Sequence, residues 1–323
     1  MATTSLHHTL GTGANQAAAG NDSRLSNSRE WTGSTVTQAE AEAGTSTTRG
    51  AWTAQRVRQA IAAWWITIPK REVLTANRIY YVRVDGNDSN TGLINSSAGA
   101  FLTIQKAIDT IYSIDLSIYD AVIQLGDGTY AAGGTLNSPL IGAGTLTIQG
   151  NAGAPANVIL SLANPGNTTG CVLANNGAMV IVKDLTVTTT VSGYGLFADN
   201  NGVLSFENIR FSACGSGHMR VQNQGIIRAS GNYSIVGSSP RHVFATGGTI
   251  RIQTITITLT GTPAFSVAFA IASINGSVVI NANTYVGSAT GSRYDANANG
   301  VVFSTATLPG SLAGTESTGG VYV

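Results

Sequence analysis

Carboxylates that could carry acid–base chemistry are few in the longer part of this chain: only 7 of the 16 acidic side chains lie after residue 119. Among them, Asp184 and Glu207 fall at neighbouring positions of consecutive repeats, and Asp199 lies on the strand before Glu207. Two carboxyl groups on either side of a glycosidic bond can cleave it, one as acid and the other as base or nucleophile. We favour the alternative, in which they are solvated turn residues balanced by Lys183 and Arg210, because surface charges of this kind contribute little.

Two histidines are the other candidates for proton transfer. His218 and His242 occupy nearly matching places in consecutive repeats of the chain, and an imidazole can serve as a base near neutral pH. A metal site needs further ligands, and none recurs near them, so we predict neither a metal nor a cofactor. The interpretation that we favour is a pair of histidines that close turns by hydrogen bonds.

Arginine and tyrosine side chains could bind a sugar without cleaving it. Arg228 and Arg251 hold the same position in two repeats, and could meet an acidic sugar as bidentate donors or serve as solvated charges that prevent edge association. Aromatic faces stack on sugar rings, although some of the tyrosines must instead belong to the core. The tyrosine candidates are Tyr194, Tyr233, Tyr285 and Tyr294.

The composition excludes several classes of protein. The chain of 323 residues has 17 basic and 16 acidic side chains, which argues against nucleic-acid binding by bulk charge. Its 43% hydrophobic content allows a sizeable core, and its 2 cysteines cannot form a disulfide scaffold. No window is long and apolar enough to cross a bilayer, and residues 1–16 lack the pattern of a signal peptide, so we expect synthesis in a cytoplasm without an export signal.

A repeat organises the second part of the chain. Short strings ending in glycine recur at a nearly constant interval, at Gly177, Gly202, Gly225, Gly248, Gly276 and Gly300. A period of this length that is carried by short strands predicts a solenoid whose coils stack on one another. We expect the residues two and four positions after each glycine to point inward, as Leu204 and Phe206 would after Gly202.

Two further short strands follow in each repeat, such as 185–187 and 196–198, with Gly and Asn at the bends. Three strands per repeat describe a parallel β-helix of roughly seven or eight coils. We place it at residues 120–303, followed by a loop-rich tip at 304–323. Open ends of a solenoid expose strand edges, so we predict that an amphipathic helix over 103–114 caps the N-terminal end, within an entry region at 71–119.

Residues 1–70 have a different composition and contain all 4 tryptophans. Thr37 and Glu40 form a capping box, which predicts a short helix over 38–43 that Gly44 ends. A second helix beginning after Thr53 would place Val57, Ile61, Trp64 and Ile68 on one stripe. That stripe needs a partner, either the following domain or another subunit, and the candidate contact residues are Trp31, Trp52, Trp64 and Trp65.

Several strings resemble phage tail-fibre and tailspike proteins, including related proteins of gene transfer agents. They are AAAGNDSRLSNSR (17–29), QAEAEAGTSTTRGAWTAQRVRQAIAAW (38–64), YYVRVDGNDSNTG (80–92), FLTIQKAID (101–109) and the ending from Gly287 onward. The string at 80–92 is similar to the start of pectin-lyase-like right-handed β-helices in phage spikes. The resemblance implies a homotrimer made in a bacterial cytoplasm, assembled on the virion at head or tail, and released by lysis.

The same resemblance implies a function. Residues 1–70 would attach to other virion proteins and support trimerisation, and the β-helix would bind capsule or lipopolysaccharide on the host surface. The scarcity of carboxylates favours binding over catalysis. The alternatives are a polysaccharide depolymerase or deacetylase, and a purely structural virion connector.

Overall fold

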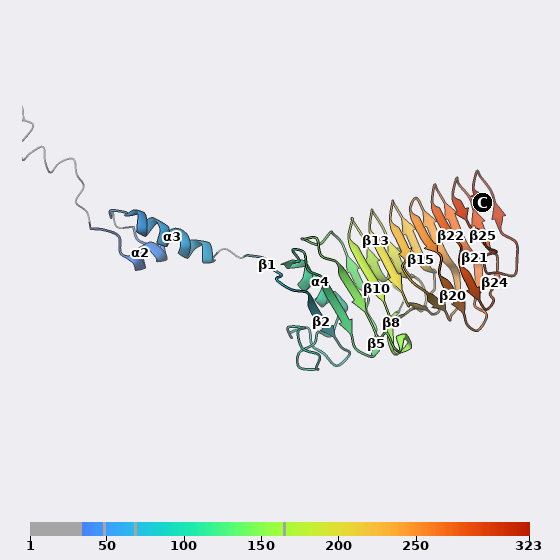
Figure 1. Ribbon diagram of the computed structural model, residues 1–323, viewed down its shortest axis with the longest axis horizontal. Coiled ribbons are helices and arrows are strands. Elements are labelled where there is room, and N and C mark those ends of the chain that lie inside the picture. Colours follow the sequence, from blue (N-terminus) through green and yellow to red (C-terminus); the bar gives the residue numbers. More distant parts are fainter. Residues whose placement is uncertain (1–33, 48–49, 68–69, 164–165) are drawn as a thin grey trace, which may run out of the picture. The chain divides into compact units, whose positions relative to one another are not determined.

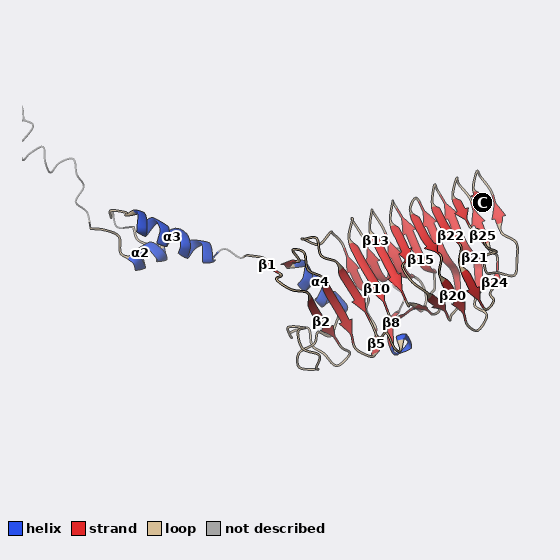
Figure 2. Cartoon of the chain, in the orientation of Figure 1, coloured by secondary structure: helices blue, strands red, loops and turns tan. Residues whose placement is uncertain are grey.

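The computed structural model describes residues 34–47, 50–67, 70–163 and 166–323. The chain forms two units, Met1–Lys70 and Arg71–Val323. Figure 1 follows the chain by colour, and Figure 2 shows that strands dominate the second unit. Three features of the sequence analysis lie outside the described residues: the string at 17–29, Trp31 and Ile68.

The described residues of the first unit include two helices. Helix α2 (Gln38–Ala43) begins at the predicted capping box, in which the Thr37 side chain accepts from the Glu40 amide and the Glu40 carboxylate accepts from the Thr37 amide. It ends at Gly44, whose positive φ of 64° is left-handed and favours glycine. Helix α3 (Ala54–Thr67) contacts α2, and Ala41 is buried in this unit. Both predicted helices are therefore confirmed.

The second unit is a right-handed parallel β-helix of about eight turns, built from three parallel sheets. Sheet 1 contains β2 (Arg78–Val82), β4 (Ala121–Leu125), β7 (Leu146–Gln149), β10 (Met179–Lys183), β13 (Val203–Glu207), β16 (Ile226–Ala229), β19 (Thr249–Gln253), β22 (Ser277–Asn281), β26 (Val301–Phe303) and β28 (Val321–Tyr322). Sheet 2 contains β5 (Gly128–Tyr130), β8 (Val158–Leu162), β11 (Thr186–Thr189), β14 (Arg210–Phe211), β17 (Tyr233–Ile235), β20 (Thr256–Leu259) and β23 (Thr284–Val286). Sheet 3 contains β6 (Gly134–Leu136), β9 (Gly170–Ala174), β12 (Tyr194–Ala198), β15 (Gly217–Gln222), β18 (Ser239–Thr246), β21 (Ala264–Ser273), β25 (Tyr294–Ala296) and β27 (Thr315–Glu316).

Smaller elements complete the unit. Strand β24 (Thr290–Gly291) pairs with β21, and β1 (Glu72–Val73) pairs with β3 (Ile114–Asp115) outside the three sheets. A short 3-10 helix η1 (Pro155–Asn157) precedes β8. The regular turns of the β-helix visit the sheets in the order 1, 2, 3, which confirms the three strands per repeat that the glycine period predicts.

The core consists of inward columns, in which alternate residues of a strand stack on those of the next coil. In sheet 1, Val182 pairs in register with Phe206, and Val180 with Leu204. These side chains are buried because the pleat turns every second residue inward. Hydrophobic burial along such columns stabilises the stack.

The first glycine of the repeat is one position out of register. Met179 pairs with Val203, so Ala178, and not Gly177, corresponds to Gly202. Gly177 has a φ of +77° and takes the left-handed position of the bend, which Asn201 takes in the next coil with a φ of +64°. The prediction that Met179 and Ile181 point inward is therefore wrong: the Met179 side chain is 63% exposed, and Ile181 pairs with Ser205 of the outward column.

An amphipathic helix closes the N-terminal end of the core, as predicted. Helix α4 (Ile104–Tyr112) buries Ile104, Ala107, Ile108 and Ile111. It contacts β2, β4 and β6, the first strands of the β-helix (Figure 1). Gly134 of β6 makes room for it, because a Cβ there would lie 2.7 Å from the Cδ1 of Ile108. The helix begins at Thr103, whose side chain accepts from the Lys106 amide.

The C-terminal segment extends the β-helix. Residues 304–323, which the composition predicts to be a loop-rich tip, contribute β27 and β28 to sheets 3 and 1. Tyr294 and Tyr322 stack there with ring centroids 4.0 Å apart and an interplanar angle of 6°. Gly314 lies over the Tyr294 ring, because a Cβ at this glycine would be 2.2 Å from it.

Candidate functional site

The candidate carboxylates Asp184 and Glu207 are engaged with neighbouring side chains where their strands end. The Asp184 carboxylate accepts from the Asn208 side chain at 2.8 Å, and Asp184 is buried, so its interpretation as a solvated residue is wrong. The Glu207 carboxylate lies 3.7 Å from the Lys183 ammonium, and the two residues pair in register. Neither carboxylate lines the cavities described below.

Asp199 shows the same behaviour at another bend of the coils. Its carboxylate accepts from the Gln222 and Asn223 side chains of the next coil at 2.8 and 3.0 Å. These bonds tie neighbouring coils together at the turn. The geometry therefore assigns a structural role to Asp199, as to the other two carboxylates.

Both candidate histidines lie inside the core, with no exposed surface. The Nε2 of His218 is 2.9 Å from the Ser212 carbonyl, to which only an N–H can bond. The His218 Nδ1 is then an acceptor, so His242 donates its Nδ1–H across 3.0 Å and accepts the Tyr233 hydroxyl at Nε2 across 2.7 Å. Every ring nitrogen is satisfied with both rings neutral.

Burial explains why neither histidine can act as a base toward a polymer. It lowers the pKa of His218 to about 3, and it lowers the pKa of His242 well below its usual range with help from the neighbouring ring. A side chain without exposed surface cannot reach a sugar bond. The expected hydrogen bonds are present, but they lie inside the core, because the inward alternation of β15 and β18 carries both rings there.

The tyrosine candidates are also mainly inward. Tyr233 is buried in the core, where burial raises the pKa of its phenol, and Tyr285 packs against the core with its phenol oxygen buried. Tyr294 is covered by Tyr322 and Gly314 at the C-terminal end. None of these three offers a free ring face to a sugar, because period-two alternation places them in inward columns. Tyr194 is buried as well, but its hydroxyl reaches a cavity described below.

The two candidate arginines do form an outward ladder. Arg228 of β16 and Arg251 of β19 pair in register, and both are exposed. Ser205 precedes them in the same column and Val279 follows. Among the described residues neither has a carboxylate within 4.0 Å. The ladder is a flat, solvated basic patch.

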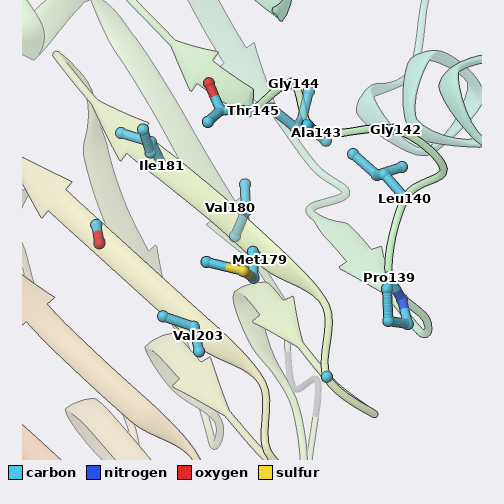
Figure 3. A pocket seen from close by; sticks show the side chains of 13 residues that line it. Pro139, Leu140, Gly142, Ala143, Gly144, Thr145, Met179, Val180, Ile181 and Val203 are labelled. Atoms are coloured by element: carbon cyan, nitrogen blue, oxygen red, sulfur yellow. The ribbon is translucent and has the colours of Figure 1, made fainter. Parts of the chain in front are cut away.

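An apolar groove of about 450 Å³ lies beside this ladder on the outer face of sheet 1 (Figure 3). The floor of the groove is formed by Met179, Ile181 and Val203, and one wall is formed by the segment from Pro139 to Thr145. No lining residue is titratable, so the groove provides apolar contact area and no acid–base chemistry. Met179 and Val203 hold the same outward position in consecutive coils, which makes the floor of the groove apolar.

A second cavity, of about 360 Å³, lies on the outer face of sheet 3 and is here named the arginine pocket. Its lining residues are Asn167, Tyr194, Gly215, Ser216, Arg220, Pro240, Arg241 and Phe244. Phe197, Arg220 and Phe244 form one outward column across β12, β15 and β18. Gly217 lies in register with Tyr194, and a Cβ there would be 2.8 Å from the Tyr194 ring and 2.9 Å from Arg241. Glycine at this position lets Arg241 approach the Tyr194 hydroxyl.

The two guanidinium groups of the pocket are packed on aromatic rings. The Arg220 carbon Cζ lies 5.3 Å from the Tyr194 and Phe244 ring centroids, and 5.5 Å from that of Phe197. The Arg241 Cζ is 4.9 Å from the Phe244 centroid. Guanidinium groups stack on rings in this way because the ring face is electron-rich, and the stacked group keeps its N–H bonds free at its edges.

Neither guanidinium has an acidic partner among the residues at 34–323 that the structure describes. Among the residues that the structure describes, the ion pairs join Arg78 to Glu72, Arg83 to Asp85 and Lys183 to Glu207. The Nε atoms of Arg220 and Arg241 are buried and have no hydrogen-bond partner in the same part of the chain. Two half-buried cations without a counter-charge form a site with an affinity for anions.

This pocket was not predicted, although a signal for it is present in the sequence. Phe197, Arg220 and Phe244 are each the middle residue of a predicted third strand, so coil stacking alone brings them into one column. The candidate arginines Arg228 and Arg251 belong instead to the first strand of the repeat. Arg241 carries no such signal, since it lies before the predicted strand and reaches the pocket through the longer β18.

The first unit presents exposed aromatic side chains. Trp52, Trp64 and Trp65 are each more than half exposed, and the Lys70 ammonium lies 4.5 Å from the Trp65 ring centroid. Val57 and Ile61 on the same helix are exposed too. The described residues of the stripe predicted on α3 are therefore exposed.

The described ranges offer neither a cluster of metal ligands nor a helix that could span a membrane. Between residues 34 and 323, gaps excluded, no group of three or more His, Cys, Asp or Glu side chains is placed to hold a metal ion. The described helices include none with the length and apolar character needed to cross a membrane. Cys171 and Cys214 are buried thiols, and burial raises the pKa of Cys214 to about 12.

Comparison with known proteins yields no relative: no family model matches the chain, and neither the curated proteins nor the solved structures contain a match. The fold is established by the strand pairing itself, as a parallel β-solenoid. The function is therefore inferred from the surfaces described above.

Proposed function

We propose that this protein is a virion spike that binds host-surface polysaccharide through its β-helix and attaches to the particle through its first unit. The observation that carries the proposal is the arginine pocket. It combines two unpaired guanidinium groups with aromatic side chains on a stiff sheet, and this combination suits a polar, ring-shaped ligand. The resemblance of the strings at 38–64 and 80–92 to phage tail proteins supports the virion context.

A stiff β-helix supports this function physically. Neighbouring coils are joined by continuous parallel ladders, so side chains on an outer face keep fixed spacings. A polymer that repeats its sugar units can then meet several contacts at once. If three copies assemble, weak individual sites gain effective concentration for one another.

The exposed stripe on α3 supports an attachment or assembly role for the first unit. Apolar patches rimmed by polar residues commonly mark protein–protein contacts. Val57, Ile61 and Trp64 follow a spacing of four and three residues, which is the spacing of helices that pack against one another. We assign this stripe to contacts with virion proteins or with other copies of the chain.

Binding without cleavage fits the site better than a depolymerase does. A glycosidase needs two carboxylates facing a cleft, and the lining residues of the arginine pocket include none. Asp184, Asp199 and Glu207 are engaged in bonds between coils. The second candidate, a depolymerase that uses Asp184 and Glu207, therefore has no geometric observation in its favour.

The test measures binding and cleavage in the same tube. Purified full-length protein is mixed with host cells, or with extracted capsule or lipopolysaccharide, and bound protein and released reducing sugar are both quantified. We expect binding without sugar release. Sugar release that is abolished in D184N/E207Q would support the depolymerase, and absence of both signals would leave a structural connector.

A further inference from the structure

We propose that the arginine pocket selects acidic polysaccharides by binding a sugar carboxylate between Arg220 and Arg241. This proposal deepens the proposed function and rests on it in one respect, namely that the ligand is a polysaccharide. Three properties of the two guanidinium groups support it: their fixed positions, their missing counter-charge and their planar shape.

Protein contacts hold both guanidinium groups in place from one side. The Arg220 Nη1 donates to the Asn167 carbonyl at 2.9 Å, and the Arg241 Nη1 donates to the Ser216 carbonyl at 3.1 Å. Both Nη1 atoms also donate to the Tyr194 hydroxyl, at 3.3 and 3.5 Å. This shared hydroxyl brings the two cations to the same point of the surface. Their orientation is thus set before any ligand arrives, which lowers the entropy cost of binding.

In the described part of the chain, one donor of each guanidinium group lacks a hydrogen-bond partner. Each anchored group uses Nη1, and each Nε is buried without a hydrogen bond among the described residues. Two like charges that share a hydroxyl repel each other. An anion between them would accept from the guanidinium edges that line the pocket and would remove the repulsion. The pocket therefore favours a negatively charged group over a neutral hydroxyl.

The shape of the donor set favours a carboxylate. An arginine presents parallel N–H bonds that match the two oxygens of a planar carboxylate. The apolar walls of Phe244 and Pro240 would contact the sugar ring that carries the carboxylate. Sulfate and phosphate esters share the negative charge and differ in being tetrahedral, so a direct comparison distinguishes the two chemistries.

The chain contains its own matched control. Arg228 and Arg251 are also two arginines on adjacent coils, but they are exposed and lie on sheet 1. R228Q/R251Q and R220Q/R241Q change the net charge equally. A larger loss of glycan affinity in R220Q/R241Q than in R228Q/R251Q would therefore be due to the arginine pocket. Equal losses of affinity in the two variants would be due to the change in net charge.

The experiment uses the full-length protein on an array of bacterial polysaccharides that are neutral, carboxylated, or sulfated and phosphorylated. We expect binding to carboxylated members, and loss of that binding after their carboxyl groups are reduced to alcohols. Binding to none of the glycans would overturn the proposed function itself. Binding that is equal for neutral and carboxylated members, or restricted to sulfated and phosphorylated ones, would overturn the carboxylate proposal and leave the proposed function standing.

Variants then locate the site on the best-bound glycan. We expect R220Q/R241Q to weaken binding about 30-fold or more, because each lost guanidinium leaves the carboxylate without a desolvated partner. R228Q/R251Q should stay within about twofold of the parent, since solvated charges contribute little. Unchanged binding by R220Q/R241Q, with its fold verified by circular dichroism, would overturn the proposal.

A lysine pair separates charge from geometry and guards against misfolding. R220K/R241K keeps both charges and loses the planar fork, and we expect about a tenfold loss of affinity. Full affinity in this variant would contradict the proposal that the planar guanidinium groups recognise the carboxylate. If R220Q/R241Q does not fold, the lysine pair and competition by free glucuronate against free glucose decide the question, and equal competition by the two sugars would contradict the proposal.

Discussion

His218 and His242 face each other inside the β-helix with their Nδ1 atoms 3.0 Å apart, and one must donate to the other. The chain from the Tyr233 hydroxyl through both rings to the Ser212 carbonyl is complete with both histidines neutral, the state that their burial favours. A buried hydrogen-bonded chain of this kind links two coils at 218 and 242. It therefore contributes to stability and makes that stability depend on pH.

The first prediction concerns acid. Since burial lowers the pKa of His218 to about 3, the unfolded chain takes up protons below its usual pKa of 6.5 before the folded chain does. The contribution is present above pH 6.5 and is lost as pH falls toward 3, by about 2 kcal/mol for His218 at pH 5. Urea unfolding at pH 7.5 and pH 5 measures it. In H218Q/H242Q, most of the difference in unfolding free energy between the two pH values should disappear. An equal difference in this variant and in the parent would contradict the assignment of the pH dependence to these histidines.

The second prediction removes one oxygen. Tyr233→Phe deletes the donor to the His242 Nε2 and leaves a buried acceptor unpaired, so we expect a loss of about 1–3 kcal/mol in the free energy of unfolding. Tyr112→Phe is the control, because the Tyr112 hydroxyl bonds to the Ser138 carbonyl at an exposed site. A loss in Tyr233→Phe no larger than in this control would show that the buried chain contributes little.

The third prediction tests the close packing of the coil turns. Gly202→Ala would place a Cβ 2.1 Å from the Ala174 carbonyl oxygen, which forces the neighbouring coil to move. We expect a loss of about 1–3 kcal/mol, as for other overpacked sites. Gly153→Ala is matched to it, since its added Cβ approaches only the Asn151 side-chain oxygen, at 3.6 Å. Thermal unfolding compares the two, and equal melting temperatures would refute the steric argument.

The fourth prediction concerns the capping helix. Ile108 of α4 is fully buried against the first coil, and Ile108→Ala should cost about 2–5 kcal/mol through lost burial and the cavity left behind. Ile118→Ala is the control, because that side chain is 75% exposed. Chemical denaturation of both variants provides the measurement. A neutral Ile108→Ala would mean that the helix does not seal the core.

The fifth prediction concerns the first unit. Ile61→Ser with Trp64→Ser removes two exposed apolar side chains of α3, and we expect the protein to shift toward monomers, or to lose attachment to particles. Light scattering after size exclusion reports the oligomer, and co-sedimentation with spike-free particles reports attachment. Arg58→Ser on the same helix is the control. Unchanged assembly and attachment in the double variant would remove α3 from the interface.

Sequence periodicity predicted the architecture because a β-helix is built from local repetition. The glycine strings mark the turns, the alternating apolar residues mark the inward columns, and the stripe of Ile104, Ala107, Ile108 and Ile111 marks the cap. The glycine repeat failed at Gly177, because this glycine occupies the bend position of Asn201 and not that of Gly202, so the expected inward positions were one residue off. An offset of one residue exchanges the inward and outward faces of a strand, and the apolar run at 179–182 fits either assignment.

Composition and short-range period were sufficient to establish the stacked coils, their approximate number and the scarcity of catalytic groups. They were not sufficient to establish which polar residues are accessible. The folded chain places His218 and His242 in the core, and it brings Arg220 and Arg241 together at the Tyr194 hydroxyl. The physical reason is that accessibility and charge pairing depend on contacts between coils, and a one-residue change in register reverses the direction of a side chain.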